Sequence, residues 1–264
     1  MTPSTAKGGQ VAAEFDIEIS ARGPVRVGER RYAEEKLARI AKFAPRPIIH
    51  ARAILSEESN PSVERPATAE AILDVSGRIV RAHVAAAQMR EAVDMLEDRL
   101  RRLLEELSDM YRTRRRANGR TEVSSARPAF SPRPVEEREV VVHKTFADEP
   151  QTPEEAALDM RLLDFDFYLF KNVRSGEDNV LYRGPDGPLG WLQVTPGADP
   201  GDGYALELQP NHAPAPTIAV EEATSRLDVS GEPFVFFVDP STGRGSLVYR
   251  RYDGNYGLIR AADD

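Results

Sequence analysis

The side chains of this sequence that can do chemistry are mainly cations, because the usual catalytic groups do not occur in spacings that fit a reaction. The four histidines are scattered singly, without the His-x-His or His-x-x-x-His spacing of metal ligands. No cysteine is present, which excludes a thiol nucleophile, a thiolate zinc site and disulfide bonds. The neighbouring carboxylates at 57–58, 105–106 and 154–155 are typical of solvated helices and loops. The sequence therefore predicts no enzyme, no cofactor and no metal site.

Two glycine-containing motifs are better interpreted as turns than as ligand loops. The Gly-x-x-Gly-x-x-Gly run at 184–190 lacks the following helix and the lysine of a phosphate-binding loop. The Asp-x-Ser-x-Gly run at 239–243 lacks the acidic residue that completes a calcium loop.

Basic residues are concentrated in the first half of the chain. Residues 1–120 hold 22 Lys and Arg against 18 Asp and Glu (net +4), and residues 121–264 hold 13 against 25 (net −12), which together give −8. Such cations bind phosphates and supply affinity more than sequence readout, although some must pair with the acidic residues among them. The predicted nucleic-acid contacts are Lys36, Arg39, Lys42, Arg78, Arg81, Arg90, Arg99, Arg101, Arg102 and Arg112.

Hydrophobic periodicity between residues 14 and 116 predicts the elements that position these cations. Alternation of apolar and polar residues predicts strands near 15–19, 49–55, 69–75 and 78–84. Helical spacing predicts a helix over about 28–44 and a long amphipathic helix over 89–110. The order β-α-β-β-β-α predicts an α+β domain, a four-stranded sheet with two helices on one face.

The segments that flank this domain have a different composition. Residues 1–13 are small and polar and are predicted to be a disordered tail. Residues 117–136 are rich in Ser, Pro and Arg and are predicted to be a flexible linker. The basic run at 114–116 either follows a polyanion or complements the helix dipole. Neither a signal peptide nor an apolar stretch of roughly 18 residues occurs, so we expect a cytoplasmic protein.

The rest of the chain contains an internal duplication. Residues 154–192 align without a gap with residues 221–259, at an offset of 67 positions, and the identities fall at turns and core positions. Each copy predicts a strand, a helix and three further strands. We predict a degenerate first module at 137–195, beginning with a strand at 140–142, and a second module at 204–264, beginning with a strand near 204–208. Units this small are marginally stable alone.

Three segments carry a family resemblance. The sequences YAEEKLARI (32–40) and MREAVDMLEDRLRR (89–102) resemble the two helix patterns of the long-form ribosome hibernation promoting factors. The sequence SLVYRRYDGNYGLI (246–259) resembles the signature that ends the C-terminal domain of that family. With the predicted order of elements, the resemblance covers nearly the whole chain.

The resemblance implies a function for residues 14–116. They would bind the small ribosomal subunit, through its 16S rRNA and ribosomal proteins, in the mRNA and tRNA channel near the decoding centre. The 70S ribosome would then be held inactive under stress or in stationary phase. The basic residues of the two helices would be the rRNA contacts, and Arg78 and Arg81 extrapolate that role to a strand.

The sequence departs from the family in having two C-terminal modules, as in some actinobacterial relatives, where the usual long form has one that pairs with a copy on another ribosome. We hypothesise that the two modules pair within one chain and silence single ribosomes. Two alternatives stay open: the second module joins ribosomes into 100S dimers, or the chain is a stress-regulatory protein-interaction module without ribosome binding. The predicted pairing residues are aromatic strand residues: Phe167, Phe170, Phe234, Phe236, Tyr249 and Tyr256.

Overall fold

The computed structural model describes residues 17–60, 63–113, 137–143, 149–184, 188–251 and 253–261. The chain divides into two compact units, one formed by residues 1–116 with 162–164 and the other by the remaining residues. Each unit is described by itself. The predicted tail (1–13), the basic run (114–116), the predicted linker (117–136) and the predicted turn at 185–187 lie outside the described residues.

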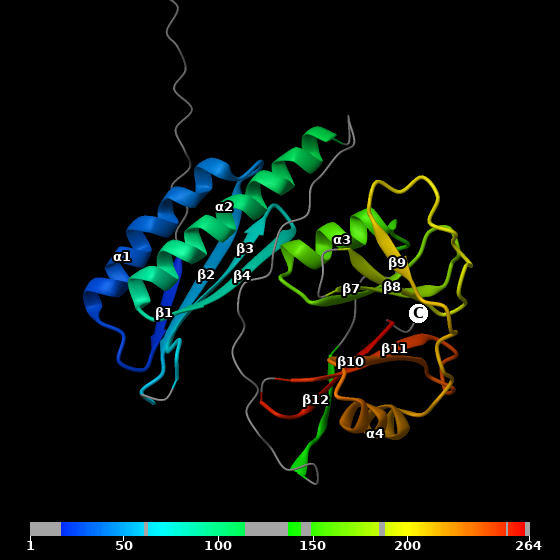
Figure 1. The fold of residues 1–264 in the computed structure, drawn as a ribbon. Helices are drawn as coiled ribbons and strands as arrows, with labels where there is room; N and C mark the ends of the chain where they lie inside the picture. Colours follow the sequence, from blue (N-terminus) through cyan, green and yellow to red (C-terminus); the bar gives the residue numbers. More distant parts are fainter. Residues whose placement is uncertain are drawn as a thin grey trace, which may run out of the picture. The chain divides into compact units, whose positions relative to one another are not determined.

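The first unit is a four-stranded sheet with its helices on one face (Figure 1). Strands β1 to β4 lie side by side in chain order; β1 is parallel to β2, and the other neighbours are antiparallel. This architecture confirms the predicted α+β class. The elements are β1 (Glu18–Arg22), α1 (Val27–Leu37), the 3₁₀ helix η1 (Ala38–Phe43), β2 (Ile48–Glu57), β3 (Ala67–Val75), β4 (Arg78–Ala86) and α2 (Met89–Thr113).

The core of this unit follows from the two periodicities. Alternate residues of β3, from Ala67 to Val75, are fully buried, and so is the apolar stripe of α2 that includes Leu96, Leu100 and Leu107. The alanines of the strands let the long α2 approach the sheet closely. Ile49 alternates with Ala51 and Ala53 in the sequence, but it is 69% exposed, because the register of β2 shifts between Ile48 and His50.

The predicted helix over 28–44 is divided into two parts. Regular α-helix ends at Leu37, and the chain continues as η1 to Phe43 before Pro45 and Pro47. A 3₁₀ turn is a common ending of an α-helix. The tighter winding moves Lys42 and Phe43 away from the positions that a regular helix would give them.

The second unit contains two four-stranded sheets. One has the order β6-β7-β8-β9 and the other β10-β11-β12-β5. In Figure 1 they form the two inner layers between α3 and α4. The elements are β5 (Val140–His143), α3 (Pro153–Leu162), β6 (Phe167–Lys171), β7 (Asp178–Arg183), β8 (Leu189–Gln193), β9 (Leu208–Pro210), α4 (Val220–Ser230), β10 (Phe234–Val238), β11 (Gly245–Arg250) and β12 (Tyr256–Arg260).

The first strand of each predicted module lies in the sheet of the other module. Strand β5, predicted at 140–142 as part of the first module, pairs in parallel with β12 of the second. The strand predicted near 204–208 as the start of the second module is found at 208–210 as β9, and it pairs in parallel with β8 of the first. The sequence pattern did not predict that these two strands are exchanged between the sheets. An alternating pattern predicts a strand but not its neighbour, which depends on contacts distant in sequence.

Side chains around β5 and β9 hold the exchanged strands in place. Just before β5, Arg138 donates to Asp228 on α4 at 2.7 Å. Asp228 also accepts hydrogen bonds from Arg250 and from the hydroxyl of Tyr256. Near β9, the backbone N–H of Ala205 donates to Glu154 on α3 at 3.0 Å. Each exchanged strand is therefore tied to the helix that covers its host sheet.

Candidate nucleic-acid interface

Helices α1 and α2 of the first unit lie side by side and run in the same direction. Tyr32 donates to Asp94 at 2.7 Å, and the ammonium of Lys36 lies 2.9 Å from both Asp94 and Glu97. The hydrogen bond to Asp94 raises the pKa of Tyr32 and holds the pKa of the Asp94 carboxyl below its usual range. The hydrogen bonds to Glu97 and Asp94 raise the pKa of Lys36. Lys36 thus joins the two helices, and its charge is balanced.

Further along the same pair of helices, cations lie against aromatic rings. The ammonium of Lys42 lies 4.8 Å from the centroid of the Phe43 ring, and the guanidinium of Arg101 lies 6.0 Å from it. The guanidinium of Arg46 lies 4.5 Å from the centroid of the Tyr111 ring. We call these five residues the cation–aromatic seam. A cation over a ring is held in place while its charge stays available to a polyanion, and rings interleaved with cations are typical of nucleic-acid surfaces.

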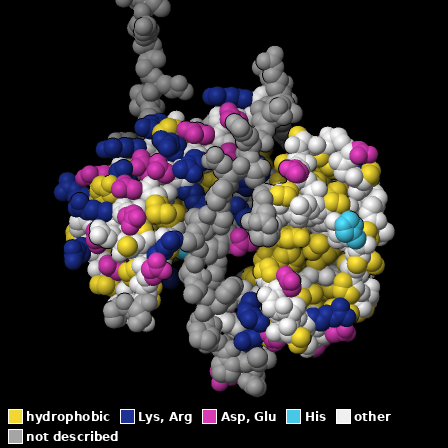
Figure 2. All heavy atoms as spheres, viewed as in Figure 1, with side chains coloured by type: hydrophobic (Ala, Val, Ile, Leu, Met, Phe, Trp, Pro, Cys, Tyr) yellow, Lys and Arg dark blue, Asp and Glu magenta, His cyan; other side chains and the backbone are white. Residues whose placement is uncertain are grey.

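The seam collects two of the predicted contacts, Lys42 and Arg101, although 59 positions separate them (101 − 42). Arg101 also pairs with Asp98 at 3.1 Å. Arg39 and Arg102 are exposed on the same two elements. Arg90 is exposed and lies 5.4 Å from the ring centroid of Tyr32. Figure 2 shows many Lys and Arg side chains on this unit, with Asp and Glu among them.

Other predicted contacts are not gathered at the seam. Arg81 pairs with Glu70 at 2.6 Å, two strand residues on the face without helices. Arg78 contacts the sulfur of Met110 at 3.7 Å. Arg99 is half-buried and donates to the carbonyl of His83 at 3.5 Å. Arg112 is exposed near the end of α2, 4.0 Å from Asp109. The rRNA-binding role of all ten residues stays a prediction.

Sequence reasoning missed three members of the seam. Arg46 lies in the Pro45–Pro47 segment that ends the first helical region, and Phe43 and Tyr111 are aromatic residues beside cations. The alternation of cations and aromatic residues across positions 42–46 is the signal that could have found them.

The part of the chain that the structure describes holds neither a metal-binding cluster nor a membrane-spanning helix. Among the described residues, no group of three or more His, Asp or Glu side chains could hold a metal ion. None of the described helices is long and apolar enough to cross a membrane.

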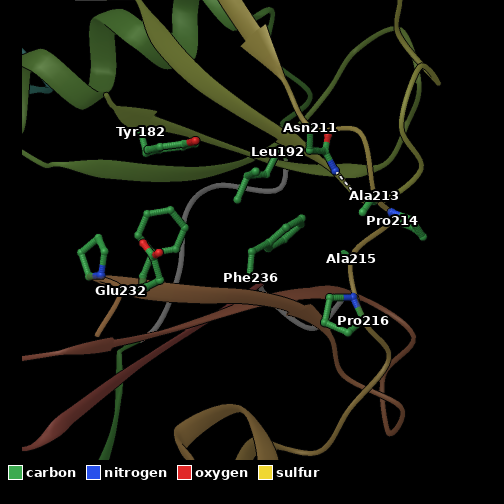
Figure 3. Close-up of a pocket in the computed structure, with 11 residues that line it drawn as sticks. Tyr182, Leu192, Asn211, Ala213, Pro214, Ala215, Pro216, Glu232 and Phe236 are labelled. Carbon is green, nitrogen blue, oxygen red and sulfur yellow. Dashed lines mark hydrogen bonds between the residues drawn. The ribbon is translucent and has the colours of Figure 1, made fainter. Parts of the chain in front are cut away.

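An open pocket of about 290 Å³ lies in the second unit between the two sheets (Figure 3). Leu192 of β8 and Phe236 of β10 enter it from opposite sides, and Pro214 and Pro216 line its rim. The side-chain amide of Asn211, which also lines the pocket, accepts from the N–H of Gln193 at 2.9 Å and donates to the carbonyls of Gln193 and Ala213. Because these backbone groups occupy the amide, Asn211 has little capacity left to orient a ligand, and the other polar side chains that line the pocket are Tyr182 and Glu232.

The faces of the two sheets that point away from their helices share one hydrophobic cluster. Its buried members are Leu169 and Val180 from one sheet and Phe236 and Leu247 from the other. The ring centroids of Phe167 and Phe234 are 5.1 Å apart, those of Phe167 and Tyr249 are 5.0 Å apart, and those of Tyr182 and Phe234 are 5.4 Å apart. Hydrophobic side chains also gather at this junction in Figure 2.

Four of the six predicted pairing residues belong to this cluster: Phe167, Phe234, Phe236 and Tyr249. The other two are elsewhere. Tyr256 packs in the core between α4 and its own sheet. Phe170 follows Leu169 on β6, and because side chains alternate along a strand it lies on the opposite face.

Comparison with known proteins identifies the class to which this fold and these surfaces belong. Residues 17–112 match the family described as "Sigma 54 modulation protein / S30EA ribosomal protein", and residues 135–190 and 210–258 both match the family described as its C terminus. The double match agrees with the internal duplication. A ribosome hibernation promotion factor from Deinococcus radiodurans is 33% identical over 174 residues, which cover 62% of this chain and 90% of that protein. The chain belongs to the S30EA family of ribosome hibernation promotion factors.

Other relatives match one part of the chain. A dormancy associated translation inhibitor from Mycobacterium tuberculosis is 40% identical over 124 residues, 43% of this chain and 44% of that protein. The chain therefore matches less than half of that relative's length. The N-terminal domain of Protein Y from Thermus thermophilus is 25% identical, with a TM-score of 0.30, over 35% of this chain and 99% of that one.

Proposed function

We propose that this protein is a ribosome hibernation factor. Its first unit binds the small ribosomal subunit in the mRNA and tRNA channel near the decoding centre, inhibits translation under stress and stabilises inactive 70S ribosomes. Membership of the S30EA family carries this proposal. The names of two relatives, a hibernation promotion factor and a translation inhibitor, agree with it.

The cation–aromatic seam is the part of the first unit that we propose contacts rRNA. Arg46 and Lys42 lie over rings, and no acidic partner of either is among their contacts in the described residues. Lys36 and Arg81, by contrast, each lie within 3 Å of a carboxylate. A phosphate must displace that carboxylate to bind them, which costs part of the gain. Binding therefore concentrates at Lys42 and Arg46, while Arg101 of the seam must first release Asp98 and contributes less.

Co-sedimentation of the full chain with small ribosomal subunits at several salt concentrations tests this proposal. Replacing Lys42, Arg46 and Arg101 together by Gln should weaken binding at least about tenfold and reduce the salt slope by about one for each phosphate that these side chains neutralise in the wild type. The matched control replaces Arg30 and Arg31 by Gln, since both are paired with acids on α1, and should change little. No binding of the wild-type chain at low salt would favour a stress-regulatory module that binds another protein.

We also propose that the two C-terminal modules pair with each other inside one chain. The shared cluster and the reciprocal exchange of β5 and β9 support internal pairing. Separating the modules would break two parallel strand pairs and expose aromatic residues. The tether between the modules also places them at a high effective concentration.

The mass of the free protein tests internal pairing without ribosomes. Sedimentation equilibrium should give the monomer mass of 29.3 kDa over a wide range of concentrations. Pairing of the second module between chains would instead give a dimer that forms as the concentration rises.

A further inference from the structure

The two modules contact each other through equivalent positions. Phe167 and Phe234 are 67 positions apart (234 − 167), the offset of the duplication, and their rings meet. The contact between Phe167 and Tyr249 is matched by the reciprocal contact between Tyr182 and Phe234. Reciprocal contacts of this kind define a two-fold relation, in which a residue on the axis meets its own equivalent.

One pair on this axis breaks the symmetry. Asp178 and Gly245 are also 67 positions apart (245 − 178), and they begin β7 and β11. The carboxylate of Asp178 accepts from the backbone N–H of Gly245 at 2.8 Å. It also accepts from Nε and Nη2 of Arg244, at 2.8 and 2.9 Å. The Asp178 side chain is only 6% exposed.

This arrangement requires two different modules. A Cβ at Gly245 would lie 2.6 Å from the Cβ of Asp178, so a side chain on both modules does not fit. Two copies of the first module would place Asp178 against a second Asp178, and like charges at a buried position repel. Two copies of the second module would leave Arg244 without this carboxylate.

We infer that Asp178, Arg244 and Gly245 form a specificity lock that makes each module prefer the other over a copy of itself. The inference rests on the proposed internal pairing and names the residues that direct it. A bidentate arginine–carboxylate pair whose carboxylate is buried contributes geometry as well as energy. Specificity arises when the wrong pairing buries like charges or unpaired groups. The lock therefore acts against pairing of identical modules between two chains.

Sedimentation velocity of the full chain over a range of concentrations tests the lock. The wild type should stay monomeric. D178G makes both modules carry glycine at the axis, and it should populate a dimer of chains. The equilibrium constant for folding of the paired modules should also fall at least about 30-fold in this variant. R226M is the matched control, because Arg226 pairs with Glu222 within α4, remote from the axis in sequence and contacts; it should behave as the wild type.

A double-mutant cycle guards against a simple folding defect. If the pair is a lock, D178N and R244M each lower the equilibrium constant for folding of the paired modules. The double variant then lowers this constant by no more than the more damaging single substitution does. Additive losses, or a D178G protein as monomeric and as stable as the wild type, would overturn the lock. A dimeric wild type would instead contradict the internal pairing on which the lock rests.

Discussion

The two C-terminal modules share one plan but stabilise equivalent hairpins by different means. In the first, Asn172, Asn179 and Asp199 form a buried polar network, in which Asp199 accepts from Asn172 at 2.9 Å and from the hydroxyl of Tyr204 at 2.5 Å. In the second, the equivalent of Asn172 is Asp239, which accepts from the backbone N–H and the hydroxyl of Ser241, at 2.9 and 2.6 Å, and pairs with Arg260.

This difference shows that the first module, whose sequence is the more degenerate, has specific interactions of its own. Its Trp191 is 1% exposed and donates to Asn179 at 2.8 Å, so this copy has a buried aromatic core residue with a satisfied polar group. The two copies use different interactions at equivalent positions. The first module makes aromatic contacts to the second and carries at the axis a charge that the second lacks.

The largest expected effect breaks the network found only in the first module. D199A leaves the Tyr204 hydroxyl, the Asn172 amide and the Gly201 N–H without their acceptor, and it should cost about 3–5 kcal/mol of unfolding free energy. Urea denaturation measures the loss. D202A is the control, since Asp202 is exposed on the same loop, and should stay within about 0.5 kcal/mol of the wild type. Equal stability of D199A would mean that the network does not hold the first module.

The exchange of strands predicts which module is destabilised by substitutions in β5. Adjacent residues of a strand direct their N–H groups to opposite sides, so prolines at both Val140 and Val141 must remove one bond to β12. We expect a loss of about 3 kcal/mol. Hydrogen exchange should accelerate in β12 (Tyr256–Arg260), the partner of β5.

The same experiment separates the exchanged arrangement from the simpler one. In the exchanged arrangement, the exchange rates of β6 (Phe167–Lys171) change less than those of β12. Acceleration confined to β6, β7 and β8 would show that β5 completes the first module, as the sequence pattern suggested.

A matched pair of glycines tests the equivalence of the modules. A Cβ at Gly190 would lie 2.0 Å from the Tyr182 ring, and a Cβ at Gly257 would lie 2.2 Å from the Tyr249 ring. Each ring is packed against a phenylalanine of the other module. G190A and G257A should therefore each cost about 1–3 kcal/mol, measured by thermal unfolding. A tolerated substitution in one module alone would show that its tyrosine is free to move.

Acid should act on the second module through Asp239. The hydrogen bond from Ser241 holds the pKa of the Asp239 carboxyl below its usual range, against the opposing effect of burial. Its contribution to stability is present above the unfolded pKa of about 3.9 and is lost as the pH falls through the folded value. We expect D239N to flatten the fall in stability below about pH 4 by less than about 1 kcal/mol. If D239N loses stability below about pH 4 as the wild type does, the Asp239 carboxyl does not contribute to that loss.

Elements with strong periodicity were predictable from the sequence, but their partners were not. The stripe of α2 and the alternation of β3 repeat over enough residues to define their buried faces. Strands β5 and β9 are short. The strand that pairs with β5 lies more than 100 positions away in the sequence. The register shift at Ile49 gives no signal in an alternating pattern.

The candidate interface was predictable as a set of cations but not as a surface. The sequence does not say which cations have carboxylates within reach: Lys36 and Arg81 do, whereas Lys42 lies over a ring. Four of the predicted pairing aromatics lie in the cluster shared by the two sheets, whereas Phe170 and Tyr256 lie on the other faces of their strands.

Sucrose-gradient sedimentation of ribosomes with the added full chain tests the central claim most directly. If the modules pair within one chain, increasing amounts of protein should move ribosomes into an inactive 70S peak, with the protein in the same fractions and no 100S particles. A 100S peak that grows with the amount of wild-type protein would contradict the account.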